Sequence, residues 1–353
     1  MKALPDDDLA EVVARSANLW EPLRGERIFL TGGTGFVGTW LLAAFAAANR
    51  AYELDAHVVA LSRDPARFAE RFPRLAADPA LTLVAGDVET FAFPPGRFGF
   101  VVHAATEALA PPGREQPLSV IGPDFIATRR VLEGAVAAGV HRLLFTSSGA
   151  MYGPQPAGIE RLAEDARCAP DPTLEQAAYG ESKRLSEWMC AAYARRFDFT
   201  ASIARLFAFV GPLIPLDGTY AVGNFVRDAL AGGPIRVGGD GTAVRSYLYA
   251  ADLAQWLWTI LLQGGQGRAY NVGSPHGVDI ATLAQTVASV VSPGCRVEIA
   301  GRALPGSAGS RYVPDVARAE AELGLRAWTT LESGVARMAR YYAPNGSGAE
   351  TGS

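Results

Sequence analysis

The sequence predicts an α/β fold in which a parallel β-sheet carries helices on both faces. Strands of about five residues alternate with helical segments along the first 205 residues, and this alternation is typical of such sheets. A cluster of glycines directly follows the first apolar strand. Beyond residue 205, glycine- and proline-rich joints separate shorter elements, so we expect a smaller C-terminal lobe there.

The individual elements follow from the periodicity of apolar residues. An acidic start and apolar residues at helical spacing predict a helix over 6–22, ahead of the sheet. The expected strands cover residues 27–31, 57–61, 81–85, 98–102 and 141–146. The expected helices that accompany them cover residues 40–48, 124–138 and 174–196.

Composition excludes several classes of protein. The chain has 353 residues, 49% of them hydrophobic, which is enough for a full-sized core. A net charge of -4 without a long basic run argues against nucleic acid as a partner. The longest apolar stretch, Trp40 to Ala48, is too short to span a membrane, and no signal peptide is predicted. Three scattered cysteines and four scattered histidines predict no metal site and favour a cytoplasmic location.

The glycine cluster has the spacing of a dinucleotide-binding loop. Gly32, Gly35 and Gly38 form a G-x-x-G-x-x-G pattern between the first strand and the first helix. In such a loop the glycines permit a tight turn, close approach of a pyrophosphate and close packing of helix on strand, while the helix N-terminus favours negative charge. Ordinary glycine turns share this spacing, but the strand-to-helix position favours the cofactor interpretation.

The end of the second strand bears on the choice of nicotinamide cofactor. An acidic residue there would bind the ribose 2′-hydroxyl of NAD, whereas an arginine would pair with the 2′-phosphate of NADP. Ser62 occupies the expected place of the acid, with Arg63 beside it, which favours NADP. Asp64 nearby keeps NAD open. Asp87, after the third strand, is either a ligand of the adenine or a turn residue.

Three residues form a candidate catalytic group. Tyr179 and Lys183 lie four residues apart in a predicted helix and so share one face. An ammonium beside a phenol stabilises tyrosinate, and Lys183 is one of only two lysines in the chain. Ser148 belongs to the segment Thr146-Ser-Ser148 at the end of the fifth strand, at the carboxyl edge where open α/β sheets bind ligands. The plainer interpretations, a surface helical pair and a strand-end cap, become remote beside the glycine motif.

These residues resemble a known family. In order, the chain carries the glycine loop, Asp87, His103-Ala-Ala105, Ser147 to Gly153, Tyr179/Lys183, Ala204 to Pro212 and Arg245 to Asp252. Together, over roughly residues 25–345, they resemble the extended short-chain dehydrogenase/reductases of the nucleotide-sugar epimerase/dehydratase branch. The resemblance implies a Rossmann-type doubly wound sheet, a tightly held NAD or NADP, and a nucleoside-diphosphate sugar that is oxidised transiently at C4.

The resemblance also assigns roles to residues. Tyr179 would be the base, Lys183 its activator and Ser148 the hydroxyl partner. The substrate side would include Arg245 at the diphosphate, with Asn224 and Arg311 as further candidates beside Ser148. The cofactor would contact the catalytic Tyr179 and Lys183 and the following residues: Gly32, Gly35, Phe36, Val37, Gly38, Ser62, Arg63, Asp87, Val88, Ala104 and Ala105.

The predicted organisation has four parts. These are an N-terminal helical extension (1–25), an NAD(P)-binding Rossmann domain (26–205), a substrate-binding lobe partly interleaved with the sheet (206–345) and a disordered tail (346–353). A homodimer is expected from the resemblance, through the helices that start near Asp124 and Leu174. Alanine-rich faces such as Ala127/Val131/Ala135 and Ala178/Ser182/Leu185 would suit it, but ordinary packing onto the sheet explains them equally well.

The departures from the family pattern predict the reaction. Related 4,6-dehydratases place an acid pair directly after the position of Ser148, and UDP-glucuronate decarboxylases keep a glutamate two positions after it. Here Gly149 and Ala150 stand there, as small residues do in UDP-galactose 4-epimerases. Ala208 and Asp124 each replace a usual asparagine, so substrate binding is expected to differ from known epimerases.

We therefore expect a 4-epimerase. The alternative within the family is a 4,6-dehydratase or decarboxylase that uses an acid from elsewhere, with Glu107 and Glu175 as possible donors. Two further hypotheses are a reductase that exchanges NADP(H) with solvent and, from a different class, a non-catalytic nucleotide-binding protein.

Overall fold

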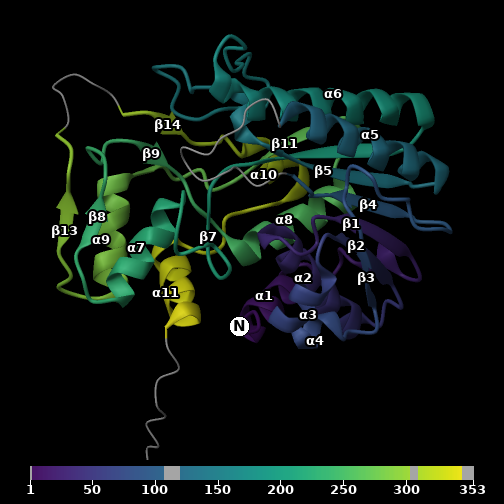
Figure 1. The fold of residues 1–353 in the computed structure, drawn as a ribbon, viewed down its shortest axis with the longest axis horizontal. Coiled ribbons are helices and arrows are strands. Elements are labelled where there is room, and N and C mark those ends of the chain that lie inside the picture. Colours follow the sequence, from purple (N-terminus) through teal and green to yellow (C-terminus); the bar gives the residue numbers. More distant parts are fainter. Residues whose placement is uncertain (1, 107–119, 303–308, 344–353) are drawn as a thin grey trace, which may run out of the picture.

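A seven-stranded parallel sheet forms the centre of the protein (Figure 1). The computed structural model describes residues 2–106, 120–302 and 309–343. The sheet has the order β11-β6-β5-β4-β1-β2-β3. Its strands are β1 (Arg27–Thr31), β2 (His57–Ser62), β3 (Leu81–Ala85), β4 (Phe100–His103), β5 (Arg142–Ser148), β6 (Thr200–Leu206) and β11 (Ala269–Val272). The predicted doubly wound parallel sheet is confirmed.

The chain reverses its direction of travel across the sheet between β1 and β4. From β1 it builds outward through β2 to β3, and then it returns to place β4, β5 and β6 on the other side of β1. Open α/β sheets bind their ligands at this switch point, outside the carboxyl ends of the strands. The ends of β1, β4 and β5 therefore mark where a site is to be sought.

Helices cover both faces of the sheet (Figure 1). On one face α5 (Ile121–Ala137) packs beside α6 (Ala178–Phe197). On the other lie α1 (Asp6–Arg15), α2 (Phe36–Tyr52) and α8 (Ala250–Gln263). The short helices α3 (Pro65–Arg71) and α4 (Pro73–Ala76) follow β2. Ala127, Val131 and Ala135 of α5 are buried within this single chain, so packing onto the sheet accounts for that alanine-rich face.

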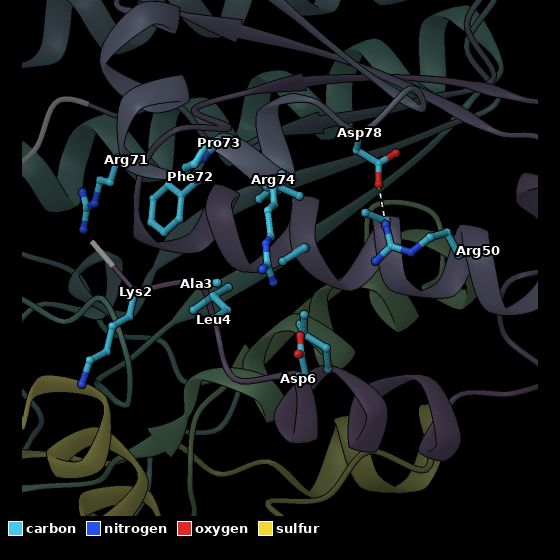
Figure 2. Close-up of a pocket in the computed structure, with 14 residues that line it drawn as sticks. Lys2, Ala3, Leu4, Asp6, Arg50, Arg71, Phe72, Pro73, Arg74 and Asp78 are labelled. Atoms are coloured by element: carbon cyan, nitrogen blue, oxygen red, sulfur yellow. Dashed lines mark hydrogen bonds and ion pairs between the residues drawn. The ribbon is translucent and has the colours of Figure 1, made fainter. Parts of the chain in front are cut away.

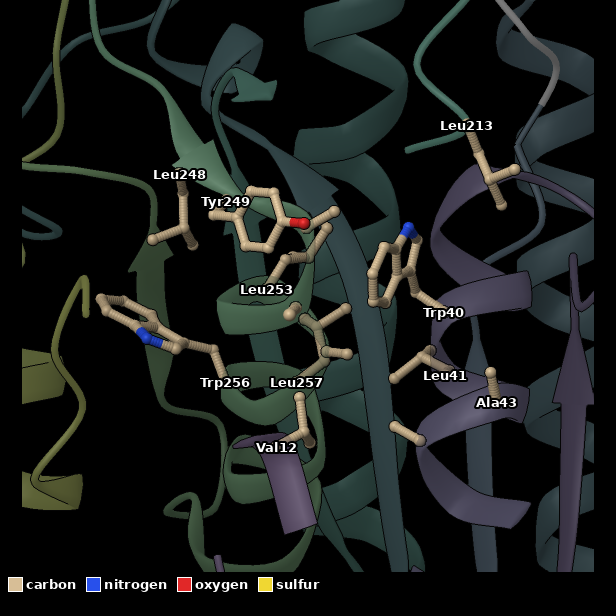
Figure 3. Packing of buried hydrophobic residues seen from close by; sticks show 14 of the residues in the cluster. Val12, Trp40, Leu41, Ala43, Leu213, Leu248, Tyr249, Leu253, Trp256 and Leu257 are labelled. Atoms are coloured by element: carbon tan, nitrogen blue, oxygen red, sulfur yellow. The ribbon is translucent and has the colours of Figure 1, made fainter. Parts of the chain in front are cut away.

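The largest core lies between α2 and α8 (Figure 3). Trp40 of α2 meets Tyr249 edge to face, with ring centroids 6.3 Å apart, and its indole nitrogen donates to the carbonyl oxygen of Pro212 (3.0 Å). Trp258 of α8 donates to the carbonyl oxygen of Leu41 (3.2 Å). Buried indoles keep a hydrogen-bond partner while contributing a large apolar surface, so these two rings fix α2 against the second half of the chain.

The second half of the chain adds a lobe beside the sheet. It contains α7 (Ala221–Leu230), α9 (Ile280–Val291), α10 (Ala317–Leu323) and α11 (Leu331–Tyr342). A three-stranded sheet has the order β12-β9-β14, made of Val278–Asp279, Val244–Arg245 and Arg311–Tyr312. Two strand pairs join β8 (Ile235–Val237) to β13 (Val297–Ile299) and β7 (Phe209–Val210) to β10 (Leu248–Tyr249). Because β11 pairs with β6, residues of this half also enter the main sheet.

The N-terminal helix is shorter than predicted. The expected helix over 6–22 is wrong beyond Arg15, where α1 ends. The Ser16 hydroxyl donates to the carbonyl oxygen of Val12 (2.5 Å) and accepts from the Trp20 indole (2.9 Å), which holds the chain in turns before the 3₁₀ turn Glu21–Leu23. Asp8 of α1 accepts from Tyr249 (2.5 Å) and Arg337 (2.6 Å), so the extension is attached to the second half of the chain.

Other boundaries shift by a few residues. The expected helix over 174–196 begins at Ala178, after a 3₁₀ turn at Glu175–Ala177, and the expected strand over 98–102 begins at Phe100. The expected helix over 40–48 is the middle of the longer α2. The predicted disordered tail lies outside the described residues. No helix within the described ranges has both the length and the apolar character needed to cross a membrane.

Candidate active site

The glycine loop is a close-packed turn between β1 and α2. Gly32 has a φ of +73°, and a Cβ there would lie 2.5 Å from the carbonyl oxygen of Ala104, at the end of the neighbouring β4. A Cβ on Gly38 would overlap the carbonyl oxygen of Gly32. The sequence therefore needs glycine at both places, one for its backbone conformation and one for contact. Behind the loop α2 begins at Phe36, so its free N–H groups face the loop.

A cavity of 460 Å³ opens in front of this loop. Its walls come from the ends of β1, β2, β3 and β4 and from the first turns of α2 and α5. They include every predicted cofactor residue apart from the catalytic pair: Gly32, Gly35, Phe36, Val37, Gly38, Ser62, Arg63, Asp87, Val88, Ala104 and Ala105. Backbone and small side chains leave room here that larger residues would fill, so the cavity fits an extended dinucleotide.

The end of the cavity near β2 is polar. The hydroxyls of Ser62 and Thr34 lie 3.1 Å apart, and Ser62 also accepts from the backbone N–H of Asp64 (3.2 Å). The Asp64 carboxylate caps α3 by accepting from the Arg67 N–H (2.9 Å), whereas Arg63 is exposed. Asp87 lines the cavity and also accepts from the Glu89 N–H (2.8 Å). Both predicted roles of Asp87, ligand and turn residue, are therefore compatible with its position.

Ser148 and the start of α6, with Tyr179, both lie at the carboxyl edge of the sheet. Ser148 is the last residue of β5, and its hydroxyl accepts from the Ala150 N–H (3.1 Å) at the start of a 3₁₀ turn, Gly149–Tyr152. This turn packs tightly on α6, because a Cβ on Gly180 would lie 2.5 Å from the carbonyl oxygen of Ala150. The first turn of α6 thus carries Tyr179 to the end of β5.

Lys183 lies beneath Tyr179 on α6. Its side chain is only 2% exposed, and its ammonium lies 5.6 Å from the centre of the Tyr179 ring and 5.3 Å from that of Phe145. The ammonium also approaches the carboxylate of Asp124 on α5, with 3.5 Å between Nζ and Oδ2. A buried charge of this kind requires partners, and these groups supply them.

A neutral hydrogen-bonded network lies behind the lysine. His103, at the end of β4, shares hydrogen bonds with Thr31 (2.8 Å at Nδ1) and Thr128 (3.2 Å at Nε2). Burial, and then the nearby positive charge of Lys183, lower the pKa of His103 to about 3. The imidazole is therefore neutral around neutral pH, and it links β1 and β4 to α5 without adding charge to the site.

Tyr312 is a site residue that the sequence did not predict by itself. Its hydroxyl is hydrogen-bonded to Ser148 and lies where a Cβ on Gly149 would be, and its ring packs on Phe207 with centroids 4.5 Å apart. Burial raises the pKa of Tyr312, so the phenol stays protonated. The only sequence signal was its position next to Arg311.

The predicted substrate residues fall into two groups. Arg245 on β9 is paired in register with Tyr312 on β14, and its guanidinium donates to the carbonyl oxygen of Ser310 (2.8 Å). Arg311 donates from Nε to the carbonyl oxygen of Glu160 (2.7 Å). Asn224, on α7, lines a separate cavity of 270 Å³ and donates to the carbonyl oxygen of Gly218 (2.9 Å). The structure thus brings Arg245 close to Ser148 through Tyr312 and places Asn224 farther out in the lobe.

A larger cavity of 680 Å³ lies away from these residues (Figure 2). It is formed by the N-terminal residues around Leu4 together with α2, α3 and α4, and an ion pair between Arg50 and Asp78 (2.5 Å) borders it. None of the predicted site residues lines it. Within the described residues, no group of three or more histidines, cysteines or carboxylates is placed to hold a metal ion.

Comparisons with known proteins agree with this geometry. The model of the NAD dependent epimerase/dehydratase family matches residues 28–273. UDP-glucuronic acid decarboxylase 1 of Arabidopsis thaliana is 27% identical over 316 residues, which are 88% of this chain and 68% of that protein. UDP-glucuronic acid decarboxylase 6 of the same plant is 27% identical over 312 residues, 88% of this chain and 87% of that protein.

Solved structures with the same architecture have several activities. DesIV, a dTDP-glucose 4,6-dehydratase of Streptomyces venezuelae solved with NAD, has a TM-score of 0.73 at 25% identity, with 90% of this chain and 96% of that one covered. MoeE5, solved with UDP-glucuronic acid and NAD, has 0.73 at 25%, covering 89% and 98%. A UDP-galactose 4-epimerase has 0.68 at 26%, covering 89% and 98%. Together with the decarboxylases above, the names of these proteins span three reactions.

Proposed function

Because the chain belongs to the NAD dependent epimerase/dehydratase family, we propose that it acts on a nucleoside-diphosphate sugar by transient oxidation at C4 and that its overall reaction is 4-epimerisation. The observation that carries this proposal is a contrast within the site. Ser148, Tyr179 and Lys183 supply the oxidation chemistry, whereas Gly149 and Ala150, next to them, supply no carboxylate.

Each residue of the catalytic group has a physical role. Tyr179 takes the proton of the C4 hydroxyl, and the Lys183 ammonium beneath the ring stabilises the resulting phenolate. The Ser148 hydroxyl, held at the end of β5, donates to the same sugar oxygen and keeps it facing Tyr179. The glycine loop and the N-terminus of α2 hold the pyrophosphate of the cofactor, whose nicotinamide accepts a hydride from C4 when bound and returns it.

The neighbourhood of Gly149 favours epimerisation. Related 4,6-dehydratases carry the first acid of their pair directly after the position of Ser148, and a side chain does not fit at that place here. A Cβ on Gly149 would overlap the Tyr312 hydroxyl and lie 2.8 Å from Cζ of Phe207. Neutral hydroxyls, those of Ser148 and Tyr312, therefore stand at the place where these relatives carry a carboxylate.

Decarboxylation of a nucleoside-diphosphate uronate is the second candidate. The named activity of the curated relatives favours it, and MoeE5 was solved with UDP-glucuronic acid. The acids suggested for this reaction were Glu107, which lies outside the described residues, and Glu175, which lies exposed in the 3₁₀ turn before α6. Burial keeps a carboxylic acid protonated to higher pH, and Glu175 lacks such burial.

Mass spectrometry of the product separates the two candidates. The purified protein is incubated with UDP-glucose, UDP-galactose, UDP-glucuronic acid and dTDP-glucose, each with added NAD. The proposal expects an isomer of unchanged mass from one of these sugars. Loss of carbon dioxide from UDP-glucuronic acid would establish the decarboxylase instead, and loss of water would establish a dehydratase.

The family is NAD dependent, and NAD is one of the two cofactors predicted from the sequence. The preference for NADP suggested by Ser62 and Arg63 stays a prediction. The Asp64 carboxylate caps α3, while the exposed Arg63 lines the cavity beside Ser62. Thermal shifts with NAD and with NADP at equal concentration test it, because a 2′-phosphate bound by Arg63 would make NADP the better ligand.

A homodimer also remains a proposal, as does a cytoplasmic location. The outer surfaces of α5 and α6 expose large apolar side chains, including Phe125, Ile126 and Trp188. Exposed apolar side chains on neighbouring helices are typical of an interface between subunits. Sedimentation of the protein, compared with a Trp188→Glu variant, tests this proposal, since the charge should shift a dimer towards monomers.

A further inference from the structure

The active site contains a buried ion pair beneath the proposed base. Lys183 on α6 and Asp124 on α5 approach to 3.5 Å, and their side chains are 2% and 8% exposed. Asp124 also accepts a hydrogen bond from the Ser182 hydroxyl (2.8 Å), so its carboxylate is held on the lysine side of α5. An ion pair this far from water is screened little, so each charge acts strongly on its neighbours.

Asp124 is close enough to the proposed active site to change the electrostatic field that Lys183 exerts on Tyr179. The same residue lines the cofactor cavity, and the ammonium that it contacts lies 5.6 Å from the centre of the Tyr179 ring. An ammonium alone strongly favours a phenolate near it, but a carboxylate paired with that ammonium cancels part of its field. The net charge beneath Tyr179 is therefore near zero, whereas a neutral residue at position 124 would leave it at +1.

We propose that Asp124 is a positioning residue that, by pairing with Lys183, moderates how strongly the lysine promotes ionisation of Tyr179. This inference rests on the proposed function, in which Tyr179 is the base. It predicts that Tyr179 releases its proton at a higher pH than it would with a neutral side chain at position 124. The pair thereby sets the pH range in which the enzyme works.

Other groups around the pair are neutral or already paired. Four titratable side chains face Tyr179 or Lys183 from the surrounding elements, and burial shifts the pKa of each towards its neutral form: His103, Cys190, Tyr220 and Tyr312. Glu187, one turn beyond Lys183, is bound by the Arg205 guanidinium (2.7 Å). Arg245 faces Tyr312 from β9 and donates to Ser310. Among the residues that the structure describes, Asp124 is thus the carboxylate in direct contact with the lysine.

Titration of the tyrosine tests the proposal without any turnover. The phenolate absorbance of the full-length protein is followed against pH, and the curve of the Tyr179→Phe variant is subtracted. The same difference is measured in an Asp124→Asn background. We expect the midpoint of the Tyr179 transition to fall by about one pH unit in Asp124→Asn, as one charge removed at several ångströms would cause at an effective dielectric constant near 20.

The matched control is Asp252→Asn. This side chain is also a buried carboxylate, paired with Arg15 at 3.2 Å in a different part of the molecule, and its loss should leave the midpoint unchanged. Asp124→Ser serves as a second variant if Asp124→Asn does not fold. An unmoved or higher midpoint in both Asp124 variants, or an equal shift in Asp252→Asn, overturns the proposal. Failure of the 4-epimerase assignment would appear in the product mass and would leave this titration interpretable.

Discussion

The two sides of the active site are built in different ways. The proposed cofactor side is formed by backbone, with Gly32 and Gly38 packed against neighbouring carbonyl oxygens and α2 beginning at the cavity. The substrate side is formed by side chains from distant strands, among them Ser148, Tyr312 and Arg245. A site formed by closely packed backbone tolerates almost no substitution of its glycines. A site formed by side chains can change through single substitutions that leave the backbone in place. This difference explains how relatives can share a cofactor site and differ in reaction.

Tyr179→Phe should have the largest effect, because the phenol serves both sides. Removing the hydroxyl takes away the base and leaves the ring in place, so kcat should fall by roughly 10²- to 10⁴-fold while NAD binding changes little. Steady-state kinetics and a thermal shift with NAD measure the two effects. Tyr193→Phe, elsewhere on α6, is the control and should stay within about twofold of the parent. Unchanged turnover in Tyr179→Phe would favour the non-catalytic hypothesis.

Gly38→Ala should break the cofactor side specifically. The new methyl would overlap the carbonyl oxygen of Gly32, which is backbone and cannot rotate away. We expect a loss of about 1–3 kcal/mol in stability and a more than tenfold weaker affinity for NAD, measured by urea unfolding and calorimetry. Gly233→Ala is the matched control, since a Cβ there meets nothing within 4 Å. Normal NAD affinity in Gly38→Ala would mean that the loop is not the pyrophosphate site.

The buried, neutral imidazole of His103 should make the stability of the folded protein depend on pH. Its pKa is about 3 in the folded protein and should return to the ordinary 6.5 on unfolding. Between these values only the unfolded chain binds the extra proton, so stability is fully present above pH 6.5 and is lost as the pH falls towards 3. His103→Gln should reduce the loss of stability between pH 7 and pH 5 by about 2 kcal/mol in urea unfolding. His276→Gln removes an exposed histidine and should leave that loss unchanged.

The features that the sequence predicted correctly are local patterns, and most of them lie on the cofactor side. The glycine loop, β3 over residues 81–85 and the one-turn spacing of Tyr179 and Lys183 are local patterns, and the structure places each as predicted. The helix expected over 6–22 was wrong because the Ser16 side chain bonds Val12 and Trp20 and holds a turn, which periodicity does not reveal.

Contacts between distant segments were beyond local patterns. Tyr312 reaches Ser148 only because β14 pairs with β9 beside the end of β5. Asp124 pairs with Lys183 because α5 packs beside α6, and the sequence alone does not show which residues of the two helices come into contact. Both contacts involve residues that we propose to act on the substrate or on the base. The sequence therefore predicted the family, whereas the contacts that bear on the reaction came from the structure.

Gly149 and Tyr312 offer the finest test of the substrate side. Gly149→Ala places a methyl against the Tyr312 hydroxyl, so we expect kcat/KM for the sugar to fall about tenfold, or about 1.4 kcal/mol, with NAD affinity unchanged. Tyr312→Phe removes the hydroxyl and its bond to Ser148, and a fall of a few-fold is expected. In the double variant the overlapping oxygen is gone, although Cζ of Phe207 and Cζ of residue 312 each remain 2.8 Å from the new methyl. The two losses should therefore not add, and the double-mutant cycle should show a coupling above about 0.5 kcal/mol. Strict additivity would mean that the two residues act on the sugar independently and that Tyr312 does not occupy the place of a side chain at position 149.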